Sequence, residues 1–266
     1  MLTLLQSRRP ILVGVVHLQA CPGSPRFSGD RERTLERAAD DARALAAGGC
    51  DALIVENFGD VPFHKLHAPS ETIATLALAL SRVRQVVGGL PVGVNVLRND
   101  ARAALGLCAA TGASFFRVNV HTGAAVTDQG LIEGDAANTL RERARLCPGA
   151  ALLADVHVKH AVPLGGGTIG QAAQDAMGRG LADAVIVTGR GTGHAPDGAL
   201  LAEVRAAIGT GALLIGSGLS EHNARELLAC ANGAIVGTFF KRDGRVSEPV
   251  DEARVARLRA VFDARG

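Results

Sequence analysis

Short apolar runs alternate with longer amphipathic segments along the whole chain of 266 residues. Segments with helical periodicity separate the apolar runs. The runs predict strands at 11–17, 51–56, 91–97, 114–120, 150–157, 183–188, 212–216 and 234–238. The helices are expected near 32–47, 70–87, 100–111, 136–146, 169–180, 198–208, 220–230 and 251–263. Parallel strands covered by helices on both faces read as nearly continuous apolar runs. Strict alternation of eight strands and eight helices therefore predicts an α/β fold, the (β/α)8 TIM barrel.

The approach to every second strand repeats a pattern of small residues, at 48–52, 111–114, 180–184 and 231–234. Each is typical of a helix that ends at a small residue and turns tightly into a strand. A fourfold recurrence favours a barrel built from two-unit modules over a doubly wound open sheet. Since no linker rich in Pro or Ser and no block of charge divides the sequence, we expect one barrel domain over residues 1–266.

Polar residues gather where the predicted strands end, and in this fold such ends form the functional face. These residues are His17, Glu56, Asn95, Arg117, Asn119, His121, Asp155, His157, Lys159 and Thr188. Because side chains alternate along a strand, Arg117, Asn119 and His121 are expected to share one face. The same alternation places Asp155, His157 and Lys159 together. An unpaired buried charge is costly, so Arg117 is expected to pair with Glu56 or Asp155.

These residue types favour acid–base chemistry. The candidate catalytic residues are Glu56, Asp155, His121 and Lys159, while His17, Asn95, Arg117, Asn119, His157 and Thr188 are expected to bind substrate. Lys159 also suits a Schiff base, or a simple contact to a phosphate or carboxylate. One alternative is a buried polar network that only plugs the barrel. Another is a divalent metal bound among Asp155, His157, His160 and Glu56, although no motif such as H-E-x-x-H is present. No cofactor is predicted.

Glycine-rich segments follow the last two predicted strands, where this fold commonly binds phosphate through backbone N–H groups. The candidate phosphate-binding residues are Gly216, Ser217, Gly218, Gly237, Thr238 and Lys241. Glycine allows the backbone to approach a ligand closely, although it also serves tight turns. The Gly-rich segment 188–194 is expected to act as a lid, and the long loops 57–69 and 121–135 as covers of the site.

Composition limits the choice of partner. The formal net charge is +2, and the chain has no Trp or Tyr, which argues against nucleic-acid binding. Five scattered cysteines are typical of a reduced compartment, and no apolar run is long enough to form a transmembrane segment. We therefore expect a cytoplasmic protein whose partner is a small phosphorylated ligand. The oligomeric state stays open, a homo-oligomer included.

Several stretches resemble the BtpA/SgcQ family. They are VHL at 16–18, PGSPRF at 22–27, ENFGDVPF at 56–63, GVNVLRND at 93–100, RVNVHTGAAVTDQGLIEG at 117–134, ADVHVKHAVPL at 154–164, GLADAVIVTG at 180–189, GSG at 216–218 and GTFFKRDG at 237–244. The resemblance implies a TIM barrel similar to the ribulose-phosphate-binding group. It implies no particular reaction, since the family is named for a role in photosystem I accumulation.

Three functions follow as hypotheses. The first is an enzyme that acts on a small phosphorylated metabolite, a sugar phosphate or a nucleotide, by lyase, isomerase or glycosidase chemistry. The second, from the family name, is an assembly factor for a membrane protein complex, which requires an exposed docking patch. The third is a metal-dependent hydrolase that uses the region around Asp155 and His157.

Overall fold

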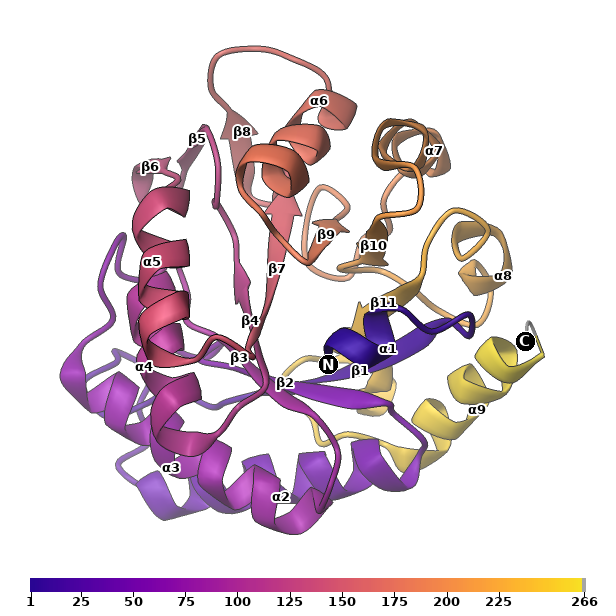
Figure 1. Ribbon diagram of the computed structural model, residues 1–266. Coiled ribbons are helices and arrows are strands. Elements are labelled where there is room, and N and C mark those ends of the chain that lie inside the picture. The colour runs from indigo at the N-terminus through magenta and orange to yellow at the C-terminus, as the bar shows by residue number, and fades with distance from the viewer. Residues whose placement is uncertain (265–266) are drawn as a thin grey trace.

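The computed structural model describes residues 1–264 as a closed barrel of parallel strands surrounded by helices (Figure 1). The strands are β1 (Ile11–His17), β2 (Ala52–Glu56), β3 (Val92–Asn95), β4 (Phe115–Val118), β7 (Ala151–Val156), β9 (Ala184–Val187), β10 (Ala212–Ile215) and β11 (Gly233–Val236). They follow one another around the barrel in chain order, and β11 closes against β1. Each lies within or next to the residues of one predicted strand, so the predicted (β/α)8 barrel is confirmed.

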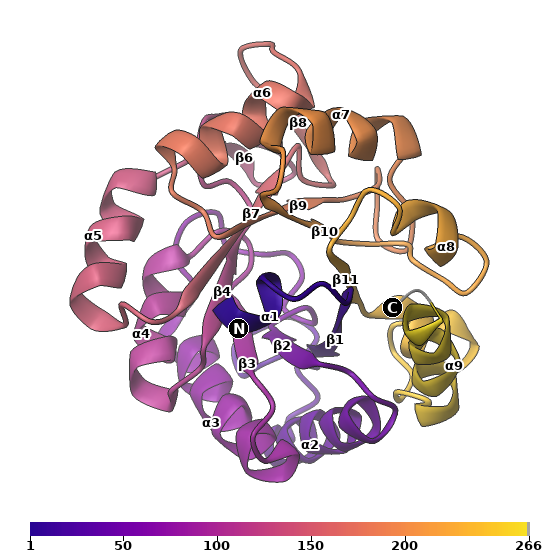
Figure 2. The same cartoon turned by 45° about the vertical axis from the view of Figure 1, so that its right-hand side comes forward.

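The helices form a ring outside the barrel, as Figure 2 shows from a second direction. They are α2 (Arg31–Ala47), α3 (Ser70–Val87), α4 (Ala101–Thr111), α5 (Ala136–Leu146), α6 (Ile169–Gln174) continued by the π-helical turn η1 (Asp175–Arg179), α7 (Gly198–Ile208), α8 (Ala224–Leu227) and α9 (Glu252–Asp263). Aspartate side chains cap α2, α4, α7 and α9 by accepting a backbone N–H of the first turn. Such caps fix where these helices begin.

The helix predicted over 220–230 is mostly wrong, because only α8 is helical there. The Asn223 side chain accepts the backbone N–H of Ser220 and donates to the carbonyl of Gly218. An Asn side chain that bonds nearby backbone groups competes with helix formation. The segment before α8 is therefore a turn, next to the glycine loop that follows β10.

Two features were absent from the predicted pattern. A short helix, α1 (Leu2–Leu5), lies at one end of the barrel and packs Leu5 against its interior (Figures 1 and 2). The predicted loop 121–135 contains a hairpin of β5 (Ala124–Thr127) and β6 (Gly130–Glu133). With β8 (Ala161–Pro163) it forms a three-stranded sheet in the order β6-β5-β8. This sheet lies beyond the ends of β4 and β7, beside the predicted functional face. The short 3-10 turns η2 (Thr238–Phe240) and η3 (Arg242–Gly244) follow β11.

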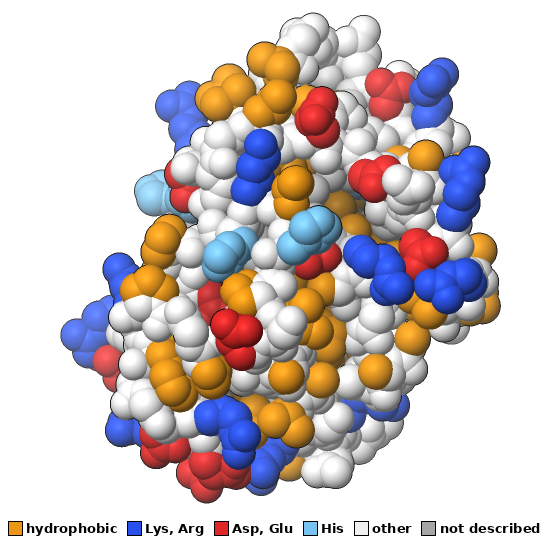
Figure 3. All heavy atoms as spheres, turned by 90° about the vertical axis from the view of Figure 1, so that its left-hand side faces the viewer, with side chains coloured by type: hydrophobic (Ala, Val, Ile, Leu, Met, Phe, Trp, Pro, Cys, Tyr) orange, Lys and Arg blue, Asp and Glu red, His pale blue; other side chains and the backbone are white. Residues whose placement is uncertain are grey.

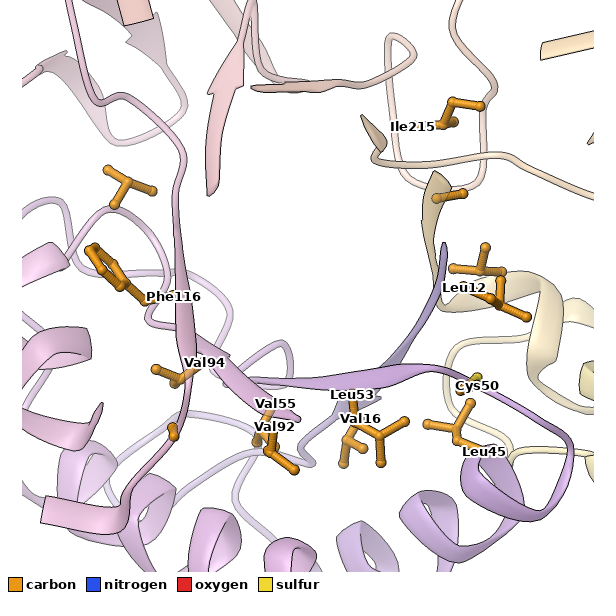
Figure 4. Close-up of a cluster of buried hydrophobic side chains, with 14 of the residues drawn as sticks. Leu12, Val16, Leu45, Cys50, Leu53, Val55, Val92, Val94, Phe116 and Ile215 are labelled. Atoms are coloured by element: carbon orange, nitrogen blue, oxygen red, sulfur yellow. The ribbon is translucent and has the colours of Figure 1, made fainter. Parts of the chain in front are cut away.

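Alternate positions of each strand enter two separate apolar clusters. Outward-facing residues pack against the helices, and Figure 4 shows Val16, Leu53, Val55 and Val92 pointing from the strands toward them. Inward-facing residues fill the barrel: Ile11, Val13, Val15, Ala52, Ile54, Phe115, Ala151, Leu153, Ala184, Ile186, Ala212, Leu214 and Ile235. Small residues at several of these positions make room for large ones. A Cβ on Gly93, for example, would lie 2.4 Å from the Phe115 ring.

Candidate functional site

A layer of polar residues and glycines lies directly above the apolar interior, at the C-terminal ends of the strands. Strand register aligns His17 with Glu56, Glu56 with Asn95, and Asn95 with Arg117 around the barrel. Asp155, Thr188, Gly216 and Gly237 each lie two positions beyond an inward-facing apolar residue. The alternation rule therefore places all of them in the same layer. This supports the prediction that the polar strand ends face inward.

Arg117 is the centre of this layer. Its Nε and Nη2 atoms each donate to a carboxylate oxygen of Asp155 at 2.9 Å, and Nη1 donates to Oε1 of Glu56 at 3.3 Å. Asn95 donates to Glu56, and Asn119 donates to Asp155. Burial lowers the pKa of Arg117, but the two carboxylates outweigh burial and raise it above its ordinary value. The predicted pairing of Arg117 is confirmed, with both carboxylates at once.

A cavity of about 300 Å³ opens above this network, and we call it the mouth pocket. From the polar layer it is lined by His17, Glu56, Arg117 and Lys159. From the glycine segments it is lined by Gly216, Ser217, Gly218, Gly237 and Thr238. Thr192 and Gly193, from the segment predicted as a lid, complete one side. The polar strand ends and the glycine loops, both predicted from the sequence, therefore line the same pocket.

Glycine is required at two positions of the mouth pocket. Gly218 has φ +69°, and a Cβ there would lie 2.0 Å from the backbone N of Ala195. A Cβ on Gly237 would lie 2.4 Å from Cε1 of His17. Within residues 1–264, the backbone N–H groups of Gly218, Leu219 and Gly237 donate to no protein acceptor. These donors are left for a ligand, and backbone N–H groups in such a loop are well suited to an anion.

Lys159 lines the mouth pocket without a partner of its own: its Nζ makes no hydrogen bond or ion pair among the residues described. Its backbone is held from two sides, since the N–H donates to Oγ1 of Thr188 at 2.8 Å and the carbonyl accepts from Nη2 of Arg98 at 2.9 Å. Burial, and then the positive charge of Arg117, lower the pKa of Lys159 below its ordinary value. The amine is therefore easier to deprotonate than an exposed lysine.

His17 also enters the pocket with a neutral side chain. Its ring lies 4.5 Å from that of Phe58, which belongs to the long loop after β2. Burial, followed by the charges of Lys241 and Lys159, lowers the pKa of His17 well below 6.5. Near pH 7 the imidazole is uncharged, so one ring nitrogen can accept a proton while the other donates.

Two predicted histidines lie elsewhere. Beyond Val118 the chain leaves β4, so the alternation that placed His121 beside Arg117 no longer holds. The ring of His121 instead bonds the carbonyl of Gly180 at 2.7 Å and does not line the mouth pocket. His157 follows the end of β7 with φ +48°, and it lines a second cavity rather than the mouth pocket.

Lys241, predicted to bind phosphate, also lies away from the mouth pocket. Its ammonium is buried in an ion pair with Asp41 of α2 and does not line the mouth pocket. Asp41 also accepts the backbone N–H of Val250, so this pair ties together distant parts of the chain. The structure therefore does not bring Lys241 together with the glycine segments that line the mouth pocket. Asn95 and Thr188 lie behind the pocket: Asn95 bonds Glu56, and Thr188 holds the backbone of Lys159.

Sequence reasoning missed Arg254. It lies in the first turn of α9, lines the mouth pocket, and stacks its guanidinium 4.7 Å from the Phe239 ring centre. Nε donates to the carbonyl of Phe239 at 2.6 Å, while the two Nη atoms bind no protein atom in residues 1–264. The available signal was its place just inside a helix that follows the second glycine segment.

The second cavity, of about 460 Å³, lies on the far side of Asp155 and Asn119. His157, Thr168 and Gln171 line it, together with parts of the three-stranded sheet. Across the described part of the chain, no three His, Cys, Asp or Glu side chains come together in a way that would hold a metal ion. The same residues include no helix long and apolar enough to cross a bilayer. On the face drawn in Figure 3, acidic and basic side chains are interspersed.

Comparison with known proteins gives clear relatives. A family model described as the BtpA family matches residues 8–263. The chain is 46% identical over 252 residues to the photosystem I biogenesis protein BtpA of Synechocystis, covering 94% of this chain and 87% of that protein. It is 47% identical over 251 residues to an uncharacterized protein of Thermococcus kodakarensis, covering 94% of each.

Among solved structures, the chain is similar to phosphoribosyl anthranilate isomerase from Thermus thermophilus. The TM-score is 0.59 at 12% identity, over 96% of this chain and all of that one. It is also similar to GGGPS from Thermoplasma volcanium, with a TM-score of 0.57 at 10% identity over 99% and 98% of the two chains. At such identities the likeness shows the barrel fold alone.

Proposed function

The chain belongs to the BtpA family, and we propose that it is an enzyme that acts on a small phosphorylated metabolite in the mouth pocket. One observation carries this proposal: a single cavity is lined both by glycine loops with free backbone donors and by the Glu56–Arg117 cluster. Structural neighbours such as phosphoribosyl anthranilate isomerase act on phosphorylated compounds, which is consistent with it. A volume near 300 Å³ favours a sugar phosphate over a nucleotide.

The phosphate would lie at the glycine side of the pocket. Gly218, Leu219 and Gly237 offer backbone N–H groups there, and Arg254 offers two free Nη atoms. Arginine pairs with phosphate through two parallel hydrogen bonds, which would orient the substrate as well as bind it. The rest of the substrate would then extend toward Glu56, Lys159 and His17.

Acid–base chemistry would take place at that second side. His17 is neutral and can accept or donate a proton, while Glu56 keeps Oε2 free of protein partners within the described residues. Arg117 holds both carboxylates in fixed positions, so the proton acceptors are oriented before a substrate arrives. Isomerase, lyase and glycosidase reactions all require such a pair of proton-transferring groups.

Titration calorimetry with inorganic phosphate and glycerol 3-phosphate tests the phosphate site. We expect both to bind, and Arg254→Met to weaken binding by about 10- to 100-fold, the loss of a charge-assisted hydrogen bond worth roughly 1.5–3 kcal/mol. Arg257→Met is the matched control, because Arg257 lies on the same helix but pairs with Glu221 outside the pocket. Equal binding by the two variants would contradict the proposed site.

A second candidate, a docking role in assembly of a membrane protein complex, is favoured by one surface. Val126 lies between Leu131 and Val162 across the three-stranded sheet, and Leu164 follows β8. These four side chains are 38–67% exposed. An exposed group of apolar side chains often marks a contact with another protein. The Synechocystis relative is named as a photosystem I biogenesis protein, so photosystem I is the complex to test for this candidate.

Complementation separates the two candidates. In Synechocystis lacking its own BtpA, this chain would be expressed as wild type, as Val126→Asp/Val162→Asp, and as Glu56→Gln, and photosystem I would be quantified. If the protein acts by docking, the valine variant should not restore photosystem I and Glu56→Gln should restore it. If it acts as an enzyme, Glu56→Gln should not restore photosystem I and the valine variant should. A wild-type chain that restores no photosystem I would contradict the docking candidate.

A further inference from the structure

We propose that Lys159 is the nucleophile of the mouth pocket, and that its amine condenses with the carbonyl carbon of a phosphorylated aldehyde or ketone to form an imine. This inference rests on the proposed function for its phosphate site and narrows the substrate to carbonyl compounds. Of the lysines in the described residues 1–264, Lys159 alone is half-buried, lines a cavity and has no partner for its ammonium.

The other two lysines show what Lys159 lacks. Lys241 is 1% exposed, but its charge is balanced by Asp41 within a buried ion pair. Lys65 is exposed in the loop after β2, where water stabilises its charged form. Lys159 has neither a protein partner within residues 1–264 nor full access to water. A lysine in that position is poised to lose its proton, and only the neutral amine is a nucleophile.

Charges around the pocket act in both directions. The guanidinium groups of Arg117 and Arg98 disfavour a third cation, whereas Glu56 and Asp155 favour one. Both carboxylates are already engaged by Arg117, and burial dominates the balance. The pKa of Lys159 is therefore lowered, in agreement with the geometry.

Two hydrogen bonds from other parts of the chain hold the backbone of Lys159 in place. Thr188, directly after β9, accepts its N–H, and Arg98, in the loop after β3, donates to its carbonyl. Two separate segments therefore fix the backbone of Lys159. His157 and His160, on either side, adopt positive φ angles of 48° and 56°. Non-glycine residues with such angles carry backbone strain, which tends to be kept at functional sites.

The proposed step is balanced without an oxidant or a cofactor. The nitrogen lone pair attacks the carbonyl carbon, a C–N bond forms, and the C=O π electrons move to the oxygen. Both hydrogens of the amine are transferred to that oxygen, which leaves as water while the C=N bond forms. Glu56 lines the same pocket and can carry each proton, as base and then as acid.

Borohydride trapping tests the proposal on the wild-type chain, so the result does not depend on how a variant folds. The protein is incubated with pyridoxal 5′-phosphate or dihydroxyacetone phosphate near pH 7, reduced with borohydride, digested and analysed by peptide mass spectrometry. With only three lysines, every labelled site can be assigned, and exposed Lys65 reports ordinary reactivity. We expect labelling of Lys159 to exceed that of Lys65 at least about tenfold. Lys65→Arg should not change it, and Lys159→Arg should abolish it.

The outcomes distinguish this inference from the function it rests on. If Lys159 is not labelled preferentially by either probe, although phosphate binds and protects the fold, the imine is refuted and the phosphate site stands. If Lys159 is labelled equally by pyridoxal and pyridoxal 5′-phosphate, and inorganic phosphate does not slow the reaction, the nucleophile stands and the phosphate site fails. Preferential labelling by the phosphorylated probe, slowed by phosphate, supports both.

Discussion

Replacing Arg117 with Met tests whether the polar layer is a single charge-balanced unit. The change removes three hydrogen bonds to carboxylate oxygens, two to Asp155 and one to Glu56, while it keeps much of the side-chain volume. The carboxylate side chains that remain are 0% exposed for Asp155 and 7% for Glu56, so water solvates them poorly in place of the guanidinium.

The expected magnitude follows from that burial. Breaking a buried ion pair by removing one partner costs about 3–5 kcal/mol, because an uncompensated charge is left inside. In a domain of this size, each kcal/mol shifts Tm by roughly 2–4 °C, so Arg117→Met should lower Tm by about 6–20 °C.

Thermal unfolding followed by far-UV circular dichroism measures this effect, since the chain has no Trp or Tyr. Arg145→Met serves as control: Arg145 pairs with Glu142 on the exposed side of α5, and its loss should leave Tm nearly unchanged. An Arg117→Met protein that melts within about 2 °C of the wild type would refute the reasoning.

Three further predictions concern the mouth pocket. The lowered pKa of His17 means that, below pH 6.5, the unfolded chain binds a proton that the folded chain does not. Tm should therefore fall on acidification through that range, and melts at several pH values should show a weaker fall for His17→Gln. Lys159→Met should raise Tm at pH 7, because a half-buried amine without a protein partner is removed, and borohydride labelling at that site should be lost. An unchanged or lower Tm would count against desolvation as the cause of the lowered pKa. Gly237→Ala should weaken phosphate binding in calorimetry at least about tenfold, because its Cβ would lie 2.4 Å from the His17 ring; unchanged affinity would mean that the ring moves freely.

The barrel could be predicted because its signals are local. Each strand is a short apolar run and each helix an amphipathic one, so every unit carries its own pattern. The three-stranded sheet was missed for the opposite reason. Its strands are three or four residues long, and β5 pairs with β8 across more than thirty residues of chain. Pairing between segments so far apart produces no pattern in the sequence of either one.

The site could be predicted only as far as the strands extend. Alternation places Glu56, Asn95 and Arg117 on the inner face because they lie on regular strands, and the register confirms it. The alternation no longer applies at His121, because β4 ends at Val118. Long-range contacts were equally hidden from the sequence. Lys241 was predicted to bind phosphate because it follows a glycine segment. Its ion pair with Asp41, 200 residues away, cannot be read from the sequence around it.

A crystal structure of the protein with glycerol 3-phosphate tests the central claim most directly. The account predicts a phosphate group within hydrogen-bond distance of the Gly218 and Gly237 amides and the Arg254 guanidinium, with the glycerol carbons directed toward Lys159 and Glu56. A phosphate bound in the cavity beyond Asp155, or a mouth pocket without ligand at a saturating concentration, would contradict it.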